Sequence, residues 1–564
     1  MRDSLTIVLS GEAGQGLATI EEFLVEAISK EYHVFTSKEV MSRVRGGNNT
    51  VEIRIAKDPV EALRYGIDYL FLLNNHSFYR LTKRVTDKTV VFTEDSFVSD
   101  EELGKLKATR HPLNLSELAK QAGNRIFANT ILFGYIAGML ELTKESCHEL
   151  IAARFASKGD KIIAENHNAF NLGFDLGKAY VLPKKVGKPT SIPAYKVMDG
   201  NTAIGIGTLA GGVNFIASYP MSPGTSLLVY LAEKGKEFNV LVEQAEDEIA
   251  ALNMVVGAWY AGARAIATTS GGGFALMTEA VSLAGITETP AVIHVAQRPG
   301  PATGLPTRTE QADLNLVVYA GHGEFPRIVL APGKLEDGVH LAQRAFWLAD
   351  KYQVPVFLLT DQYYLESFAQ VIPFEIDDRY LESFVVKTDV DYKRYAFDPS
   401  GISPRGIPGN GLGFVKSDSD EHDEAGQITE DFDVRVAMND KRLHKRSLLL
   451  ADYVDEELIG PKDYTNLLVG WGSTYGVIKE FIESGDSKNT AFLHIRQPFP
   501  LHPKLKKYFD QSKNTIVIEN NATGQFANLC KLELDVKIHS SILKYNGEPF
   551  SIEEITQRVT EAIR

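Results

Sequence analysis

Short apolar segments, each followed at once by a loop of glycine, proline, serine or charged residues and then by a helical stretch, recur along most of this sequence. Continuous apolar runs of this length are typical of strands buried on both faces, and strand–loop–helix alternation predicts an α/β fold with parallel sheets. The apolar segments lie at 5–10, 51–56, 69–73, 89–93, 214–218, 240–243, 265–270, 291–297, 327–331, 354–360, 465–470, 491–496 and 514–519.

The length of 564 residues predicts several domains, because domains average about 150 residues. A stretch rich in proline and lysine interrupts the pattern near residue 186, and a less regular region begins near residue 376. We therefore expect an α/β domain over 1–185, a linker over 186–198, a second α/β domain over 199–375, an irregular connecting segment over 376–460 and a third α/β domain over 461–564.

Composition excludes several classes of function. Lys plus Arg is 59 and Asp plus Glu is 73, so the net charge of −14 disfavours nucleic-acid binding. No apolar stretch reaches the roughly 18 residues of a membrane helix, and the N-terminus does not resemble a signal peptide, so we expect a cytoplasmic protein. The two cysteines, Cys147 and Cys530, are too few for an iron–sulfur cluster, which needs about four thiolates.

A glycine-rich loop, Gly11-Glu-Ala-Gly-Gln-Gly16, joins the first strand to a helix that begins near Leu17. Its free backbone N–H groups suit an anion, and Arg43 and Arg45 add guanidinium groups nearby. Gly14 and Gly16 are equally explained by a tight turn that needs positive φ, and the two arginines by an exposed surface. Both interpretations stay open.

In the second domain, polar residues follow three apolar strands. The loop Tyr219-Pro220-Met-Ser222-Pro223 holds a hydroxyl group between two prolines, which could orient a small polar substrate. Arg298 follows the strand 291–297, where a guanidinium group commonly binds a carboxylate. Thr303 and Thr307 in the next Gly/Pro loop offer further hydroxyl donors. Without other information, an interface or surface role explains Arg298 about as well.

Glu248 lies among the acids Glu243, Glu246 and Asp247 at a strand-to-helix junction. A structural explanation is that these negative charges complement the helix macrodipole, and we favour it for Glu246 and Asp247. Glu248 leads directly into a helix of apolar and small residues, so its carboxylate needs a ligand or partner if buried. His294, inside an apolar strand, is more simply a core residue. The 421–424 cluster lacks metal-site spacing, so we expect it to form a solvated or subunit-facing loop and predict no metal site in this chain.

Together these stretches resemble the 2-oxoacid:ferredoxin oxidoreductases, specifically an α subunit with an N-terminal γ domain. The resemblance rests on the motifs Gly11–Gly16 with Arg45-Gly-Gly, Ser218-Tyr-Pro-Met-Ser-Pro223, Glu246-Asp-Glu248-Ile-Ala-Ala, Thr269-Ser-Gly-Gly-Gly, Gln297-Arg-Pro-Gly-Pro-Ala-Thr-Gly-Leu-Pro-Thr307, Gly401-Ile-Ser-Pro-Arg405, Glu421-His-Asp-Glu, Gly470-Trp-Gly-Ser-Thr474 and Pro498-Phe-Pro500. Two positions depart from the family pattern: Ser222 replaces a threonine, and Glu12-Ala13 replaces part of the glycine loop.

The resemblance implies a γ domain, a thiamine diphosphate pyrimidine-type domain and a transketolase-C-like domain. It implies that Glu248 contacts the aminopyrimidine ring of thiamine diphosphate, favouring the imino tautomer that removes the C2 proton, with Tyr219 and Pro220 beside the cofactor. Ser222, Arg298, Thr303 and Thr307 would bind the substrate, and Gly14, Gly16, Arg43 and Arg45 are candidates for contacting CoA or another anion.

The resemblance also implies a β subunit that binds the diphosphate and Mg²⁺ and holds a [4Fe-4S] cluster, in an (αβ)₂ assembly. The reaction would be CoA-dependent oxidative decarboxylation of 2-oxoglutarate to succinyl-CoA, with electrons passing to ferredoxin, reversible as CO₂ fixation. Two alternatives stay open: the same chemistry on pyruvate or a branched-chain 2-oxoacid, and a non-catalytic scaffold for another subunit.

Overall fold

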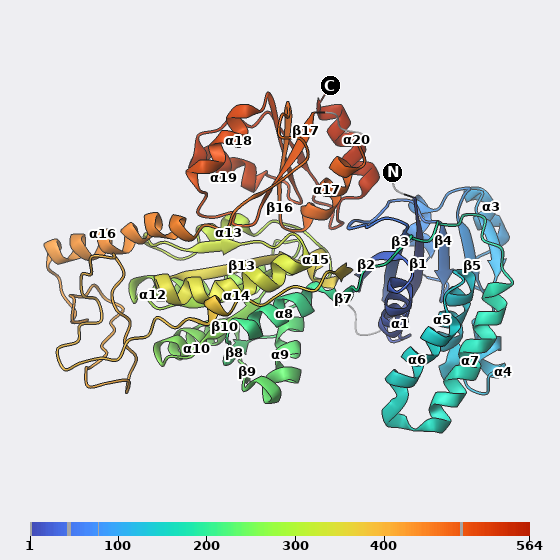
Figure 1. Cartoon of the computed structure of the whole chain (residues 1–564), viewed down its shortest axis with the longest axis horizontal. Coiled ribbons are helices and arrows are strands. Elements are labelled where there is room, and N and C mark those ends of the chain that lie inside the picture. Colours follow the sequence, from blue (N-terminus) through green and yellow to red (C-terminus); the bar gives the residue numbers. More distant parts are fainter. Residues whose placement is uncertain (1–2, 42–46, 77, 486–488, 564) are drawn as a thin grey trace. The chain divides into compact units, whose positions relative to one another are not determined.

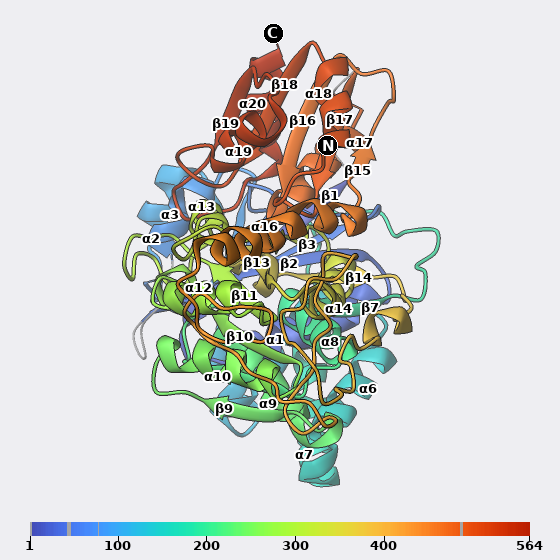
Figure 2. The same ribbon diagram turned by 90° about the vertical axis from the view of Figure 1, so that its left-hand side faces the viewer.

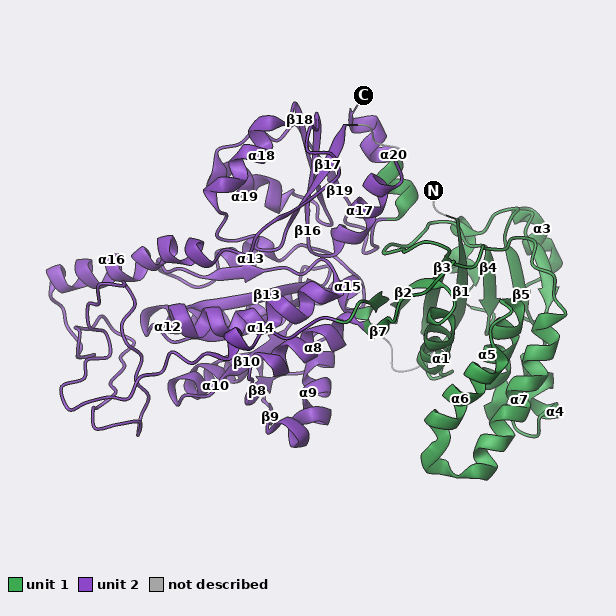
Figure 3. Ribbon diagram, viewed as in Figure 1, with its two compact units in different colours: residues 1–198, 366–373, 551–556 green, residues 199–365, 374–550, 557–564 purple. Residues whose placement is uncertain are grey.

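A computed structural model describes residues 3–41, 47–76, 78–485 and 489–563 of the chain. The chain divides into two compact units (Figure 3). Unit 1 comprises residues 1–198, 366–373 and 551–556, and unit 2 comprises residues 199–365, 374–550 and 557–564. Each unit is an α/β structure, which confirms the predicted fold class. The finer division of the chain into five segments remains a prediction.

In the described part of unit 1, eight strands form one sheet in the order β6-β5-β4-β1-β3-β2-β14-β7. Neighbours from β6 to β1 run parallel, but β3 is antiparallel to both β1 and β2. The strands are β1 (Ser4–Glu12), β2 (His33–Glu39), β3 (Asn48–Ala56), β4 (Tyr69–Leu72), β5 (Val90–Thr93), β6 (Thr109–Pro112), β7 (Lys196–Asp199) and β14 (Phe368–Val371).

The antiparallel half of this sheet differs from the parallel α/β domain that the sequence predicts. The difference begins at β2, which the apolar-segment search misses because only Val34 and Phe35 of its sequence, His-Val-Phe-Thr-Ser-Lys-Glu, are apolar. No helix is present in the described residues between β2 and β3. Antiparallel neighbours need no crossover helix, so this connection permits the reversed direction.

Separate hydrophobic clusters lie on the two faces of the sheet of unit 1: Leu5, Ile7 and Leu9 belong to one, and Val8 belongs to another. In α1 the apolar positions Leu17, Ile20, Leu24 and Ile28 are buried, as the helical periodicity predicts. The helices are α1 (Leu17–Ser29), α2 (Phe78–Leu81), α3 (Asp100–Leu106), α4 (Leu115–Gln121), α5 (Ala128–Met139), α6 (Lys144–Phe155) and α7 (Asp160–Lys178).

Unit 2 contains two sheets in its described residues. The first has the order β12-β13-β11-β10-β8-β9 with every neighbouring pair parallel, and the second has the order β15-β17-β16-β18-β19 with only β15 antiparallel. The strands are β8 (Phe215–Ser218), β9 (Leu241–Gln244), β10 (Ala265–Thr269), β11 (Ala291–Gln297), β12 (Ile328–Leu330), β13 (Pro355–Asp361), β15 (Glu457–Ile459), β16 (Asn466–Trp471), β17 (Thr490–Ile495), β18 (Asn514–Glu519) and β19 (Ser540–Leu543).

Helices cover these sheets (Figure 1). None of the described helices is both long enough and apolar enough to span a membrane. The helices are α8 (Gly200–Ala210), α9 (Thr225–Phe238), α10 (Glu248–Tyr260), α11 (Gly271–Phe274), α12 (Thr278–Ile286), α13 (Leu314–Val318), α14 (Leu335–Tyr352), α15 (Gln362–Glu366), α16 (Phe432–Leu449), α17 (Tyr475–Glu483), α18 (Lys506–Gln511), α19 (Gln525–Leu534) and α20 (Ile552–Ile563).

The region predicted to be irregular contains the long helix α16, which sequence patterning misses. Its buried face is cationic: Lys441 and Lys445 contact Glu288 at 2.7 and 2.6 Å, with all three side chains shielded from solvent. These lysines hold the pKa of Glu288 well below its usual range, against the opposing effect of burial. Residues 376–430 have little regular structure and pass in front of α10 and α12 in Figure 2.

Two helices of unit 1 cross so closely that only glycine fits at their contact. A Cβ atom at Gly134, Gly138, Gly173 or Gly177 would lie between 1.9 and 2.1 Å from a carbonyl oxygen of the facing helix, α7 or α5. The glycines repeat four residues apart on both helices and therefore lie along one face of each. The backbones themselves thus form the contact.

We predict that Gly173→Ala destabilises unit 1 by about 1–3 kcal/mol, because its methyl group would overlap the carbonyl oxygen of Ile131. Gly104→Ala in α3 is the matched control: its Cβ would meet nothing within 4 Å, so the higher helix propensity of alanine should leave stability unchanged or raised by up to about 1 kcal/mol. Hydrogen exchange of the α5 and α7 amides measures this locally. Equal protection in both variants would contradict the close-packing explanation.

Candidate active site

The predicted site residues of unit 2 lie at the carboxyl ends of its parallel strands. β8 ends before the Tyr219–Gly224 loop, β10 before Gly271–Gly273 and β11 before Arg298, and these three strands are neighbours in the sheet. α10, which begins at Glu248, follows β9, the outermost strand of the sheet, which lies next to β8. Ligands of open parallel sheets bind at this edge.

Glu248 is a buried carboxylate with an unused oxygen. It is the first residue of α10 and is 3% exposed, and its Oε1 atom has no hydrogen-bond partner among the described residues. A Cβ atom at Gly273 would lie 2.5 Å from Oε1, so the absence of a side chain at that position leaves room beside the carboxylate. An unpaired buried carboxylate oxygen is costly and fits a ligand that donates a hydrogen bond.

The neighbouring Asp247 has a different role. It is the N-cap of α10, and its Oδ1 atom accepts a hydrogen bond from the Ala250 N–H at 2.8 Å. This geometry agrees with the helix-terminal role expected of this acid. Glu246 is exposed. The structure therefore separates Glu248 from the other acids of the segment.

Arg298 and the Ser222 loop are in direct contact. Arg298 Nη1 donates a hydrogen bond of 2.8 Å to the backbone carbonyl oxygen of Ser222, while the Arg298 Nε atom has no partner among the described residues. The Ser222–Pro223 and Gly300–Pro301 peptide bonds are cis. The Arg298 guanidinium group is thus fixed through Nη1, and its Nε–H group can donate to a ligand. Burial lowers the pKa of its guanidinium group, and the nearby Asp313 opposes that effect.

The remaining predicted residues lie in the same loops. Thr303 and Tyr219 are exposed, and Thr307 and Pro220 are half-buried. Gly304 adopts a φ of +52°, and a Cβ atom there would lie 1.8 Å from the Pro299 carbonyl oxygen, so the turn after Arg298 requires glycine. Substrate and cofactor contacts of these residues remain predictions.

The sequence did not single out two acids in this part of the site: Asp313 lies near Arg298, and Glu310 lies near Asp313. Burial raises the pKa of Asp313 to about 6, an effect that Arg298 partly offsets, and burial with the charge of Asp313 raises the pKa of Glu310 to about 7. The Oδ2 atom of Asp313 is shielded and has no partner among the described residues, and the carboxylate lies against Gly271. Perturbed acids in a polar loop are typical of functional sites, but nothing in their local spacing distinguishes them in the sequence.

His294 is a core residue, as the sequence favours. Its ring is fully buried and hydrogen-bonded to Thr268 Oγ1 and Thr360 Oγ1, each at 2.8 Å, across three adjacent strands. Burial lowers its pKa to about 3, which keeps the ring neutral near pH 7. His422, in the acidic cluster expected to form a solvated or subunit-facing loop, is also fully buried, and Glu421 pairs with Arg442 and Arg435.

In unit 1, the glycine loop has the backbone conformation expected of a tight turn. Gly14 and Gly16 have φ values of +91° and +74°, and the loop is closed by a 2.7 Å hydrogen bond from the Glu12 N–H to Gln15 Oε1. Asn129 Nδ2 donates to the Gln15 carbonyl oxygen at 2.8 Å. Arg43 and Arg45 lie outside the described residues. Anion binding by this loop remains a prediction.

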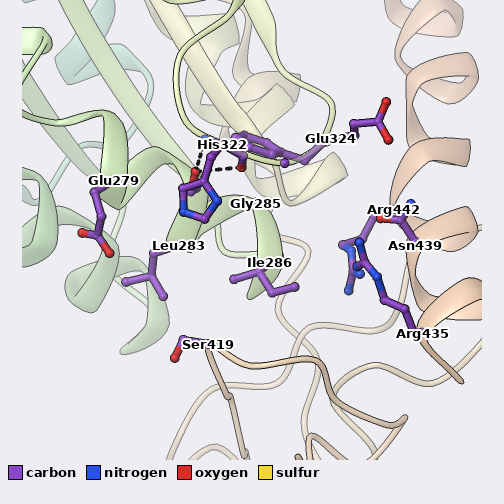
Figure 4. Close-up of a pocket in the computed structure, with 13 residues that line it drawn as sticks. Glu279, Leu283, Gly285, Ile286, His322, Glu324, Ser419, Arg435, Asn439 and Arg442 are labelled. Carbon is purple, nitrogen blue, oxygen red and sulfur yellow. Dashed lines mark hydrogen bonds between the residues drawn. The ribbon is translucent and has the colours of Figure 1, made fainter. Parts of the chain in front are cut away.

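A cavity of about 250 Å³ in unit 2 is lined by none of the predicted site residues (Figure 4). It lies among α12, the His322–Phe325 loop and α16, and Ser282 forms hydrogen bonds with both the N–H and the carbonyl oxygen of His322. Its two guanidinium groups, of Arg435 and Arg442, both pair with Glu421. Its guanidinium groups are thus already engaged within the chain.

Comparison with known proteins defines the class. Residues 206–441 match the family model "Pyruvate flavodoxin/ferredoxin oxidoreductase, thiamine diP-bdg", and residues 6–176 match the model "Pyruvate ferredoxin/flavodoxin oxidoreductase". Both models describe oxidoreductases, and the first describes a region that binds thiamine diphosphate and covers the strand-end loops above.

Relatives extend the match to the whole chain. The α subunit of a 2-oxoacid:ferredoxin oxidoreductase from Sulfolobus sp is 31% identical, with 99% of this chain and 97% of that protein covered. The 2-oxoglutarate oxidoreductase subunit KorA of Mycobacterium tuberculosis is 30% identical over 79% of this chain and 69% of its own length. The chain belongs to the 2-oxoacid:ferredoxin oxidoreductase α-subunit family, which confirms the resemblance seen in the sequence.

A solved structure shows the same fold over the full length. The 2-oxoglutarate:ferredoxin oxidoreductase from Magnetococcus marinus, with 2-oxoglutarate, coenzyme A and succinyl-CoA bound, superposes with a TM-score of 0.93 at 28% identity, covering 100% of both chains.

We predict that Asp313→Asn stabilises the chain, and more so at pH 7.5 than at pH 5. The pKa of Asp313 in the folded chain, about 6, lies above its ordinary value of 3.8, so the unfolded chain releases this proton first as the pH rises. Wild-type stability therefore falls between about pH 4 and pH 6, and the variant escapes this loss. The advantage of the variant should grow by about 1 kcal/mol between pH 5 and pH 7.5, measured by thermal unfolding. An advantage independent of pH would contradict the raised pKa.

Proposed function

We propose that this chain is the γ-domain-bearing α subunit of a 2-oxoglutarate:ferredoxin oxidoreductase. The observation that carries the proposal is the buried Oε1 atom of Glu248, which has no hydrogen-bond partner among the described residues and lies at the strand ends where Arg298 contacts the Ser222 loop. The reaction joins 2-oxoglutarate and CoA to give succinyl-CoA and CO₂, and the released electron pair passes singly to ferredoxin. In reverse, reduced ferredoxin drives carboxylation of succinyl-CoA.

The residues present fit thiamine diphosphate, the cofactor named by the family model that matches residues 206–441. A hydrogen-bond acceptor is available at Glu248 Oε1, and Gly273 leaves space beside it. When bound, thiamine diphosphate supplies the carbon nucleophile and electron sink that decarboxylation of a 2-oxoacid requires. Glu248 would hold the aminopyrimidine through this hydrogen bond, and Tyr219 and Pro220 would pack beside it.

The chain's other residues bind and orient the substrate. Arg298, fixed by the Ser222 carbonyl, directs its remaining donors to the carboxylate of the 2-oxoacid, and partial burial strengthens this charged hydrogen bond. The Ser222 hydroxyl and those of Thr303 and Thr307 provide donors around it. Gly14, Gly16, Arg43 and Arg45 of the γ domain are our candidates for contacting CoA.

Partners complete this reaction. The relatives are named as subunits, and a β subunit would supply the diphosphate and Mg²⁺ site and a [4Fe-4S] cluster in an (αβ)₂ assembly. The choice of 2-oxoglutarate is supported by the relatives from M. tuberculosis and M. marinus, which are named for it. Pyruvate is the second candidate, because both family models are named for pyruvate oxidoreductases. Assay of the αβ complex with each 2-oxoacid and CoA distinguishes them.

We predict that Glu248→Gln slows exchange of the C2 proton of bound thiamine diphosphate by about 10²–10⁴-fold in the αβ complex. Glutamine preserves shape and burial but lacks the carboxylate acceptor. The measurement is C2–H/D exchange followed by NMR after acid quench. Asp247→Asn is the matched control, because asparagine is an equally good N-cap, and its exchange should equal that of the wild type. Wild-type exchange in Glu248→Gln would refute the role of Glu248.

We predict that Arg298→Ala raises KM for the 2-oxoacid far more than KM for CoA. Loss of a charged hydrogen bond to the substrate carboxylate costs about 2–3 kcal/mol. Arg298→Lys keeps the charge but loses the planar fork, so its KM should lie between those of the wild type and the alanine variant. Steady-state kinetics with each substrate varied checks this. An equal rise in both KM values would assign Arg298 a structural role.

A further inference from the structure

In the segment that follows the Arg298 loop, Gln311 forms hydrogen bonds to the ends of two strands of the second sheet of unit 2. Its backbone N–H donates to the Asn520 carbonyl oxygen at 2.6 Å, and its Oε1 atom accepts from the Asn520 N–H at 2.9 Å. Its Nε2 atom donates to the Trp471 carbonyl oxygen at 2.8 Å, and its carbonyl oxygen accepts from Asn521 Nδ2 at 3.1 Å. Every polar atom of this fully buried residue is therefore engaged.

Further hydrogen bonds join the residues around Gln311 to the same part of the chain. The Thr309 N–H donates to the Gly547 carbonyl oxygen at 3.2 Å. Gln525 Oε1 accepts from the Asn315 N–H at 2.9 Å, while Gln525 Nε2 donates to the Ala312 carbonyl oxygen at 2.8 Å. The segment 309–315 is thus fixed along its length.

The other end of the loop is fixed to the first sheet. The side-chain oxygen of Gln297, the last residue of β11, accepts a 3.0 Å hydrogen bond from the Asp313 N–H. Within the loop itself, the Leu305 N–H donates to the Pro299 carbonyl oxygen at 3.0 Å. Residues 299–307, which include Thr303 and Thr307, therefore form a short loop between two fixed parts of the chain, β11 and the segment 309–315. A short chain with both ends held has few conformations.

We propose that Gln311 is a positioning residue that fixes the Arg298–Thr307 loop in the geometry that binds the 2-oxoacid carboxylate, an inference that rests on the proposed function. Trp471 is the last residue of β16 and Asn520 directly follows β18, so the second sheet sets the shape of a loop that follows a strand of the first. The C-terminal part of the chain, which contributes no candidate site residue, thereby takes part in substrate binding. Misplacing a binding group by about 1 Å is enough to cost 10²-fold in rate.

The test is Gln311→Ala in the assembled αβ complex. We expect faster amide hydrogen exchange confined to residues 299–315 and a KM for the 2-oxoacid raised about tenfold or more, with KM for CoA within about twofold of the wild type. Gln343→Ala is the matched control: Gln343 is equally buried and its Nε2 atom also donates to a carbonyl oxygen, that of Asp377, at 2.8 Å. This control should lose comparable stability but keep both KM values.

A second variant reaches the same contact from the other side. A Cβ atom at Gly472 would lie 2.8 Å from Gln311 Nε2, so Gly472→Ala should displace the glutamine and raise KM for the 2-oxoacid in the same direction, even if Gln311→Ala does not fold. Unchanged exchange over 299–315 in both variants overturns the inference, as does faster exchange with an unchanged KM while Arg298→Ala raises it. If the loop loosens but Arg298→Ala also leaves KM unchanged, the proposed substrate role of Arg298 has failed, whereas the anchoring by Gln311 stands.

Discussion

Parallel strands deliver their loops to one edge of a sheet, and the arrangement of unit 2 depends on this constraint. β8, β10 and β11 are neighbours and parallel, so the loops that carry Ser222, Gly271–Gly273 and Arg298 emerge together. The direct contact between Arg298 and the Ser222 carbonyl follows from that shared edge. Residues 76 positions apart in the sequence meet here because the crossover helices return each strand in the same direction.

Glycines leave room for acidic side chains at this end of the sheet. Gly271 faces the carboxylate of Asp313, and Gly273 faces that of Glu248. Two acids can therefore approach one turn of backbone without a side chain between them. Burial raises the pKa of Asp313, and the Oε1 atom of Glu248 has no hydrogen-bond partner in the part of the chain that the structure describes. The electrostatic character of the site is thus a consequence of the absence of side chains as much as of the acids themselves.

Sequence reasoning located many of the buried strands, because runs such as 291–297 and 354–360 are mostly apolar and are followed by polar or charged residues. It also placed Glu248 and Arg298 at strand ends. It missed α16, whose buried face carries lysines that neutralise Glu288, since a charged buried face has no apolar periodicity. It missed Gln311 because the partners of that residue, Trp471 and Asn520, lie 160 and 209 positions away, and their proximity exists only in the folded chain.

Unit 1 is built from segments that are far apart in the sequence, so cutting the chain at one position does not separate the units. Its sheet contains β14, residues Phe368–Val371, between β2 and β7, although the chain has by then passed through the whole first sheet of unit 2. Gln370 also accepts a hydrogen bond from Val34 at 3.2 Å and donates to the carbonyl oxygens of Ser29 and Tyr32. A fragment cut at residue 198 would leave the β2 edge bare, and bare strand edges promote self-association. A fragment that contains all of unit 1 therefore has to include residues 366–373 and 551–556 as well as residues 1–198.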